Sequence, residues 1–194
     1  LQLGYNTRIN HYNGSVGLNY YATEWLKIDG TFGIDYSGQS SEDFWPFQWN
    51  IDGFSGSRPT GQLSVGTRDF VAKTAEVKIV MDNKIGSLTS NLIVGGQYVG
   101  QQEKVLGSQG TEFPGPGFEV VGAAAQQTNF EQFTETINVG AFVQEQIGYN
   151  DYLFLTLGAR FDAHSAFGSN FNGQFYPKVS LSYIPSDSGN WSGL

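Results

Sequence analysis

Residues 41–54 carry the side chains best suited to bind a ligand, because aromatic rings alternate there with carboxylates. Rings can cover the apolar faces of a sugar or a peptide, and the polar groups beside them fix its orientation. We therefore predict a ligand-contacting loop. The alternative is that the same rings pack the loop against its neighbours or against a partner subunit. The predicted ligand-binding residues are Phe44, Trp45, Phe47, Trp49, Asp52 and Phe54.

Arg160 and Asp162 form the second candidate cluster, two positions apart in a strand-like run. Alternate residues of a strand lie on one face, so the two side chains are expected to form an ion pair. The alternative is that they contact a docked domain or a substrate.

Other chemistries find no support in the sequence. The chain has no Cys, and its two His lie in different elements, so we predict no metal site. It has no P-loop or dinucleotide fingerprint, and the adjacent His164 and Ser165 lack a third group to orient them. We therefore expect no enzyme activity and no cofactor. The net charge of −8 argues against a nucleic-acid partner.

Residues 25–36 show most clearly which elements hold these side chains. Leu26, Ile28, Phe32 and Ile34 alternate with polar or small residues over twelve positions, which predicts a two-faced strand. At ~3.3 Å per residue and a tilt of ~45°, such a strand crosses the hydrocarbon layer of a bilayer. No run of apolar residues is long enough for a transmembrane helix.

The same alternation predicts seven strands in all. Along the strand at 133–148, Glu135 and Glu145 share the apolar face, and we expect them to lie outside the apolar band. The predicted strands are 12–21, 25–36, 70–81, 86–100, 133–148, 152–163 and 175–184. The polar residues predicted to face a lumen are Lys27, Asp29, Asp35, Glu76, Lys78, Arg160 and Asp162.

Short and long connections alternate strictly between these strands. The short ones are 22–25, 82–86, 149–152 and 185–191, and the long ones are roughly 37–69, 101–131 and 165–173. In an antiparallel up-and-down sheet, every second connection lies on the same edge. Short turns on one rim, long loops on the other and aromatic residues at both strand ends are typical of a transmembrane β-barrel. We therefore predict an all-β segment of such a barrel, with short periplasmic turns, long extracellular loops and outer-membrane lipid around it.

The seven strands form an odd number, and residues 191–194 look like the start of an eighth. Bacterial single-chain barrels have even strand numbers and no open edge. We therefore expect residues 1–194 to be a partial β-barrel of a longer polypeptide.

Two segments carry a resemblance to the TonB-dependent outer-membrane receptors. Residues 140–146 (Gly-Ala-Phe-Val-Gln-Glu-Gln) resemble a barrel strand of that family, and residues 155–162 resemble its L-T-x-G-x-R-x-D strand. The S-x-F-G loop at 165–168 and the strand at 175–183 look like the SusC/RagA branch, with Tyr183 where that branch usually has Trp. These matches cover about residues 140–194.

The resemblance implies a 22-stranded barrel with an internal plug domain that imports a large nutrient, with glycan or peptide favoured. The implied partners are the remainder of the barrel and its plug, the TonB complex acting through that plug, and a SusD-like surface lipoprotein. Neither the plug nor a TonB box is found in these 194 residues. A passive porin or structural barrel, and a soluble β-rich carbohydrate-binding or adhesin module, are the alternatives.

Overall fold

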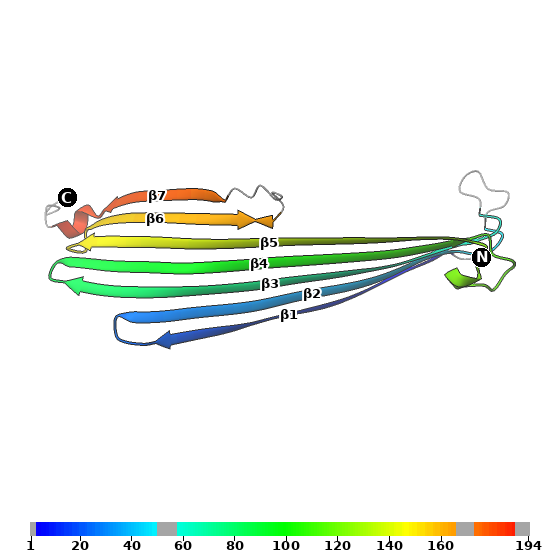
Figure 1. The fold of residues 1–194 in the computed structure, drawn as a ribbon, viewed down its shortest axis with the longest axis horizontal. Coiled ribbons are helices and arrows are strands. Elements are labelled where there is room, and N and C mark those ends of the chain that lie inside the picture. Colours follow the sequence, from blue (N-terminus) through cyan, green and yellow to red (C-terminus); the bar gives the residue numbers. More distant parts are fainter. Residues whose placement is uncertain (1–2, 50–57, 166–172, 189–194) are drawn as a thin grey trace. The chain divides into compact units, whose positions relative to one another are not determined.

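The chain folds into one antiparallel sheet of seven strands, arranged in sequence order from β1 to β7 (Figure 1). The computed structural model describes residues 3–49, 58–165 and 173–188. The predicted all-β, up-and-down fold with seven strands is confirmed. The strands are β1 (Gly4–Tyr21), β2 (Leu26–Trp45), β3 (Gln62–Ile85), β4 (Leu88–Thr111), β5 (Gln126–Tyr149), β6 (Leu153–His164) and β7 (Gln174–Tyr183).

The described residues include two short 3-10 segments, η1 (Val121–Ala123) and η3 (Pro185–Ser188). None of the described helices has the length and apolarity needed to span a membrane.

Two compact units divide the residues. The turn unit comprises Gly14–Ile34, Lys73–Gly100 and Thr136–Leu194, and it contains the short connections. The loop unit comprises Leu1–Asn13, Asp35–Ala72 and Gln101–Glu135, and it contains the β2–β3 and β4–β5 connections. Strands β1 to β5 contribute residues to both units.

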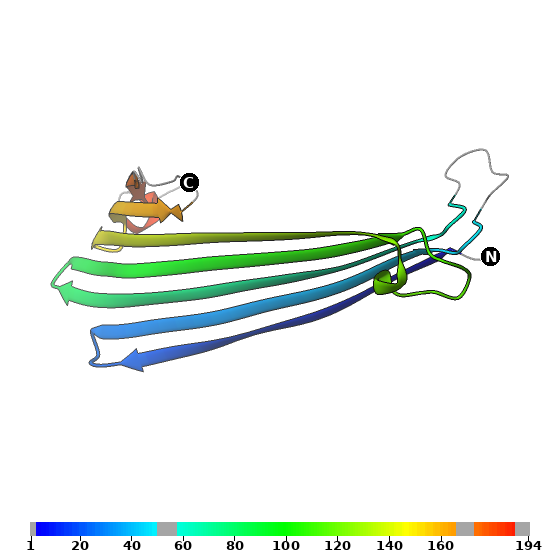
Figure 2. The ribbon, with the colours of Figure 1, turned by 45° about the vertical axis from the view of Figure 1, so that its right-hand side comes forward.

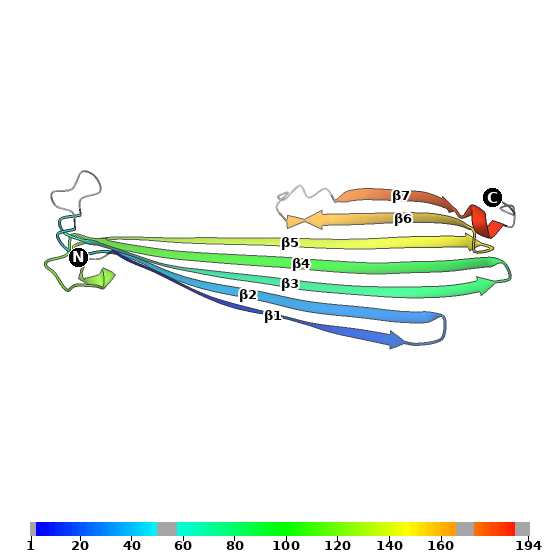
Figure 3. The same ribbon diagram turned by 180° about the vertical axis from the view of Figure 1, so that it is seen from behind.

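In the turn unit, the β1–β2, β3–β4 and β5–β6 turns lie at the same end of the strands (Figure 3). The β5–β6 turn has positive φ at Asn150 (50°) and Asp151 (61°), the geometry of the tight turns that Asn and Asp tolerate. Backbone hydrogen bonds between neighbouring strands continue to this end of the sheet. The amide of Asp82 donates to Trp25 O at 2.9 Å, and that of Asn150 donates to Ser87 O at 2.9 Å.

Several predicted boundaries were wrong by a few residues or more. The β3–β4 turn is confined to Gly86 and Ser87 and is therefore shorter than the predicted connection at 82–86. Gly86 has a φ of +60°, a conformation that glycine takes without a steric penalty. The long connections are shorter than predicted, since β2 continues to Trp45 and β4 to Thr111. Sequence hydropathy missed these extensions because both faces of the strands become polar there.

The loop unit contains a small hydrophobic core. Leu63 (3% exposed), Phe113 (4%) and Ala124 form its buried centre. Phe44 and Phe47 pack against it as half-buried side chains. Residues from β3 and from the β4–β5 connection, which carries η1 (Figure 2), thus pack together. The amide of Phe113 also donates to Thr60 O at 3.0 Å, which joins the two long connections.

Most large apolar side chains of the turn unit are exposed. Among the described residues no large side chain is fully buried. A sheet face this apolar, with nothing packed on it, is rare in water but is what a lipid-facing wall requires. The exposed face includes Val16, Leu18, Phe32, Ile34, Val77, Ile79, Val94, Val143, Leu157, Phe161, Val179 and Leu181.

Candidate functional site

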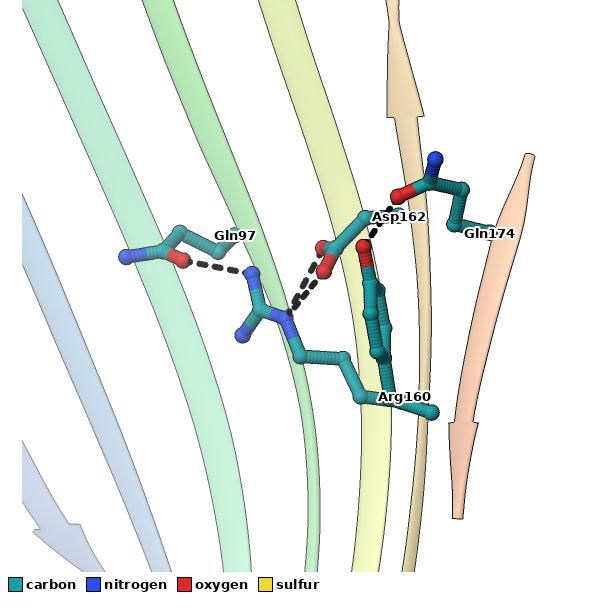
Figure 4. Close-up of polar contacts among 5 residues, drawn as sticks. Gln97, Arg160, Asp162 and Gln174 are labelled. Atoms are coloured by element: carbon teal, nitrogen blue, oxygen red, sulfur yellow. Dashed lines mark hydrogen bonds and ion pairs between the residues drawn. The ribbon is translucent and has the colours of Figure 1, made fainter.

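Arg160 joins polar side chains from two strands on the polar face of the turn unit (Figure 4). Its Nε donates to both oxygens of Asp162, at 2.8 and 2.7 Å, and its Nη2 donates to Gln97 Oε1 at 2.9 Å. The register places Asp162 opposite Gly140 on β5 and opposite Gln174 on β7. One guanidinium on β6 therefore connects to a side chain on β4, two strands away.

Bare glycines make room for this network. A Cβ on Gly140 would lie 2.3 Å from Asp162 Oδ1 and 2.7 Å from Arg160 Nη2, so the ion pair lies directly over that glycine. The Phe142 ring lies over Gly95 in the same way, and the Arg160 guanidinium lies 5.8 Å from the Phe142 ring centroid. At Gly95 a glycine of β4 thus pairs with an aromatic ring of the neighbouring strand β5.

The other predicted lumenal residues also have partners on their faces. In the turn unit, Lys27 Nζ lies 2.9 Å from Asp29 Oδ1, and Lys78 Nζ lies 3.3 Å from Glu76 Oε1.

In the loop unit, Asp35 lies 3.0 Å from His11 Nε2, a pairing that the sequence analysis did not anticipate. Each of these pairs joins side chains that share one face of the sheet. All seven predicted residues thus lie in polar pairs, and their exposure to a lumen stays a prediction.

Two carboxylates occur among the apolar positions of β5, and both accept hydrogen bonds. Ser90 Oγ donates to Glu145 Oε1 at 2.6 Å, and Gln102 Nε2 donates to Glu135 Oε1 at 2.6 Å. A neighbouring strand thus supplies a donor to each carboxylate. Whether the two lie outside the apolar band stays a prediction.

Four of the six predicted ligand-binding residues make contacts within the loop unit. Phe44 and Phe47 contact the loop-unit core. Trp45 meets Trp49 edge to face at 6.0 Å, the Arg58 guanidinium lies 5.2 Å from the Trp45 ring, and Trp45 Nε1 donates to Asp43 at 3.2 Å. Asp52 and Phe54 lie outside the described residues. A direct ligand contact of these residues stays a prediction.

Gln97, Gln174 and Tyr176 belong to the site but were not predicted from the sequence. Tyr176 donates its hydroxyl hydrogen bond to Gln174, beside Asp162. Once the register between strands is known, their position on the same sheet face as Arg160 identifies them. No group of three or more His, Asp or Glu that could hold a metal ion occurs in the part of the chain that the structure describes.

Comparison with solved structures finds the same fold in larger proteins. A chain of the RagAB peptide transporter superposes with a TM-score of 0.88 at 14% identity, over 98% of this chain and 21% of its own length. BauA, the ferric preacinetobactin receptor from Acinetobacter baumannii, superposes with a TM-score of 0.57 at 14% identity, over 90% of this chain and 28% of its own length. This chain thus spans about a fifth of the transporter chain that it resembles.

Comparison at the level of sequence gives the family. No curated protein matches the chain. The family model for the TonB-dependent receptor-like β-barrel matches residues 2–193, almost the whole length. The chain therefore belongs to the TonB-dependent receptor β-barrel family, whose members lie in the outer membrane of Gram-negative bacteria.

Proposed function

We propose that this chain is part of the barrel wall and extracellular vestibule of a SusC/RagA-like transporter that imports a large nutrient by TonB-dependent transport. Glycan and peptide are the favoured cargo classes. The observation that carries the proposal is the two-faced sheet of the turn unit. The match to the TonB-dependent receptor β-barrel family supports the same function. One face exposes Leu18, Val77 and Val179, and the other carries the Arg160 network.

Each face has a proposed neighbour. The apolar face contacts outer-membrane lipid, because moving exposed aliphatic and aromatic side chains from water into lipid is energetically favourable. The polar face contacts water or a plug domain, which lies with the remaining strands outside these 194 residues. Arg160 retains Nη1 as a further donor for such a contact, since its Nε and Nη2 bind Asp162 and Gln97.

The remaining partners are proposed through the likeness to RagAB. The TonB complex would act through the plug, and a SusD-like surface lipoprotein would sit over the vestibule. The loop unit gives this lipoprotein a packed support, because Phe47 and Phe113, from the two long connections, pack together with Leu63. We propose no catalytic activity and no cofactor for the chain.

Uptake by cells tests the proposal. The gene for the full-length protein is deleted and then restored, and uptake of a fluorescent casein digest and of fluorescent neutral polysaccharides is measured with and without functional TonB. We expect restoration to raise uptake of one cargo class only when TonB is functional. Restored uptake that persists without TonB would indicate a passive porin and overturn the energy-coupled function.

A further inference from the structure

We propose that a recess in the loop unit is a binding site for a neutral sugar unit of the imported cargo, an inference that rests on the proposed function. The recess has a volume of about 490 Å³, within the usual range for small-ligand sites. Five strands line it, and all of its residues belong to the loop unit. It is distinct from the aromatic residues of 44–54 that the sequence singled out.

On each of its strands the recess lining includes residues of the parity that is predicted to face the lumen. On β2 these are Gln39, Ser41 and Asp43, which share the parity of Asp35, and the intervening Glu42 also belongs to the lining. The corresponding positions on β3 and β4 include two glycines, Gly66 and Gly107. The recess is therefore a feature of one sheet face, on the side where a cargo would pass.

The two glycines form the floor of the recess. A Cβ on Gly66 would lie 3.2 Å from Ser41 Oγ, and one on Gly107 would lie 2.0 Å from the Phe130 ring. The Phe130 ring thus lies over Gly107, and 60% of Phe130 stays exposed. Tyr5, which also lines the recess, is 76% exposed. Two exposed rings can receive the apolar face of a pyranose.

The charged groups of the recess are mostly satisfied within the protein. Arg68 Nε donates to Glu103, and Asp43 accepts a hydrogen bond from Trp45 Nε1. Glu42 adds a further negative charge to the lining. A ligand anion would meet the carboxylates of Glu42 and Asp43, and the Arg68 guanidinium of the lining is already paired with Glu103, so an acidic cargo is disfavoured.

Neutral hydrogen-bonding groups provide the polar part of the site. Ser41 Oγ donates to Gly66 O at 3.5 Å and Gln109 Nε2 donates to Ser64 Oγ at 3.1 Å, so these groups are oriented from within. Gln39 and Thr128 make no side-chain hydrogen bond within the described residues and can bind ligand hydroxyls. Uncharged amides and hydroxyls beside exposed rings suit a neutral saccharide better than an ionised ligand.

Binding to the purified full-length protein tests the site, with a matched pair of phenylalanines. Phe130 and Phe133 lie on the same strand with 60% and 59% exposure, but at opposite parity. The probes are neutral hexasaccharides prepared from starch, mannan, xylan and galactan, with oligogalacturonate and a casein digest for comparison, and calorimetry gives the affinities. We expect at least one neutral hexasaccharide to bind. For it, F130A should weaken binding about tenfold or more, while F130W and F133A stay within about twofold.

Three outcomes would overturn the site: no neutral hexasaccharide binds, F130A and F133A weaken binding equally, or only oligogalacturonate or peptides bind in a way that depends on Phe130. None of these measurements involves TonB. If the recess proves not to bind saccharides while uptake still depends on TonB, the proposed transport function remains valid. Saccharide binding at Phe130 together with TonB-independent uptake would reject only the energy coupling.

Discussion

Arg160 and Asp162 lie two residues apart on β6, and the guanidinium Nε contacts both carboxylate oxygens, at 2.8 and 2.7 Å. Their side chains are 38% and 35% exposed. At that exposure, solvent screens most of the Coulomb attraction, so the geometry is tight while the net stabilisation is small. The value of the pair thus lies in holding the guanidinium in one orientation.

We expect a double-mutant cycle of R160Q and D162N in the full-length protein to give a coupling energy below about 1 kcal/mol. Urea unfolding of the protein in detergent measures it. The Glu76–Lys78 pair, 3.3 Å apart and 33% and 38% exposed, is the matched control and should give a similar value. A coupling of several kcal/mol at Arg160 alone would show that another part of the protein covers that pair.

Neighbouring residues of a central strand should face different solvents. Val77 (54% exposed) lies on the apolar face of β3, and the next residue, Lys78, lies on the polar face. In otherwise cysteine-free full-length protein in outer membranes, we expect K78C to react with a water-soluble maleimide at least tenfold faster than V77C. Detergent-denatured samples give the reference rates. Equal labelling in membranes would disprove the two-faced wall.

Charge placed on the two faces of β7 should have unequal costs. Val179 is 72% exposed on the apolar face, and Ser180 follows it on the other. We expect V179R to destabilise the protein folded in lipid by ~2–4 kcal/mol, the cost of Arg near the midplane of a barrel wall. S180R should change it by less than about 1 kcal/mol. Equal losses in denaturant titrations of the refolded full-length protein would contradict the assigned lipid face.

The buried centre of the loop unit should control access to the β4–β5 connection. L63A removes a side chain that is 3% exposed, which costs ~2–4 kcal/mol by loss of packing. We expect a glutamate-specific protease to cleave after Glu119 about tenfold faster in this variant, on intact cells. V120A, at a position that is 62% exposed, is the control and should leave the rate unchanged. Unchanged cleavage in L63A would show that Leu63 does not stabilise the connection.

The sequence predicted the sheet well because apolar and polar residues must alternate along a strand that has one face in lipid. Period two along Leu26, Ile28 and Ile34 is visible without any tertiary information, and the β1–β2 turn at 22–25 was placed correctly for that reason. The strand extensions to Trp45 and Thr111 were missed because, where both faces are polar, no solvent contrast marks the strand.

The site was predictable only where its residues are close in sequence. Arg160 and Asp162 share a strand, so parity alone pairs them. Gln97, 63 residues earlier, joins them through the sheet register, which a single sequence does not specify. The recess around Phe130 depends on the same cross-strand placement, because its glycine floor and its rings come from different strands.

The hydrogen bond from Ser90 to Glu145 gives a prediction that depends on the environment of the apolar face. Glu145 pairs with Leu157 in the register and accepts the Ser90 hydroxyl at 2.6 Å. S90A deletes the donor but leaves the carboxylate, so we expect a loss of ~1–3 kcal/mol in the free energy of unfolding. S90T keeps the hydroxyl and is the control.

Removing both polar groups of that pair should recover the stability. The double variant S90A/E145L replaces donor and acceptor with apolar side chains, which is close to neutral or stabilising where the surroundings are lipid. We therefore expect the double variant to unfold at a higher urea concentration than S90A. If S90A instead matches the parent protein and E145L changes nothing further, the carboxylate is hydrated, and Glu145 lies at the rim as the sequence predicted.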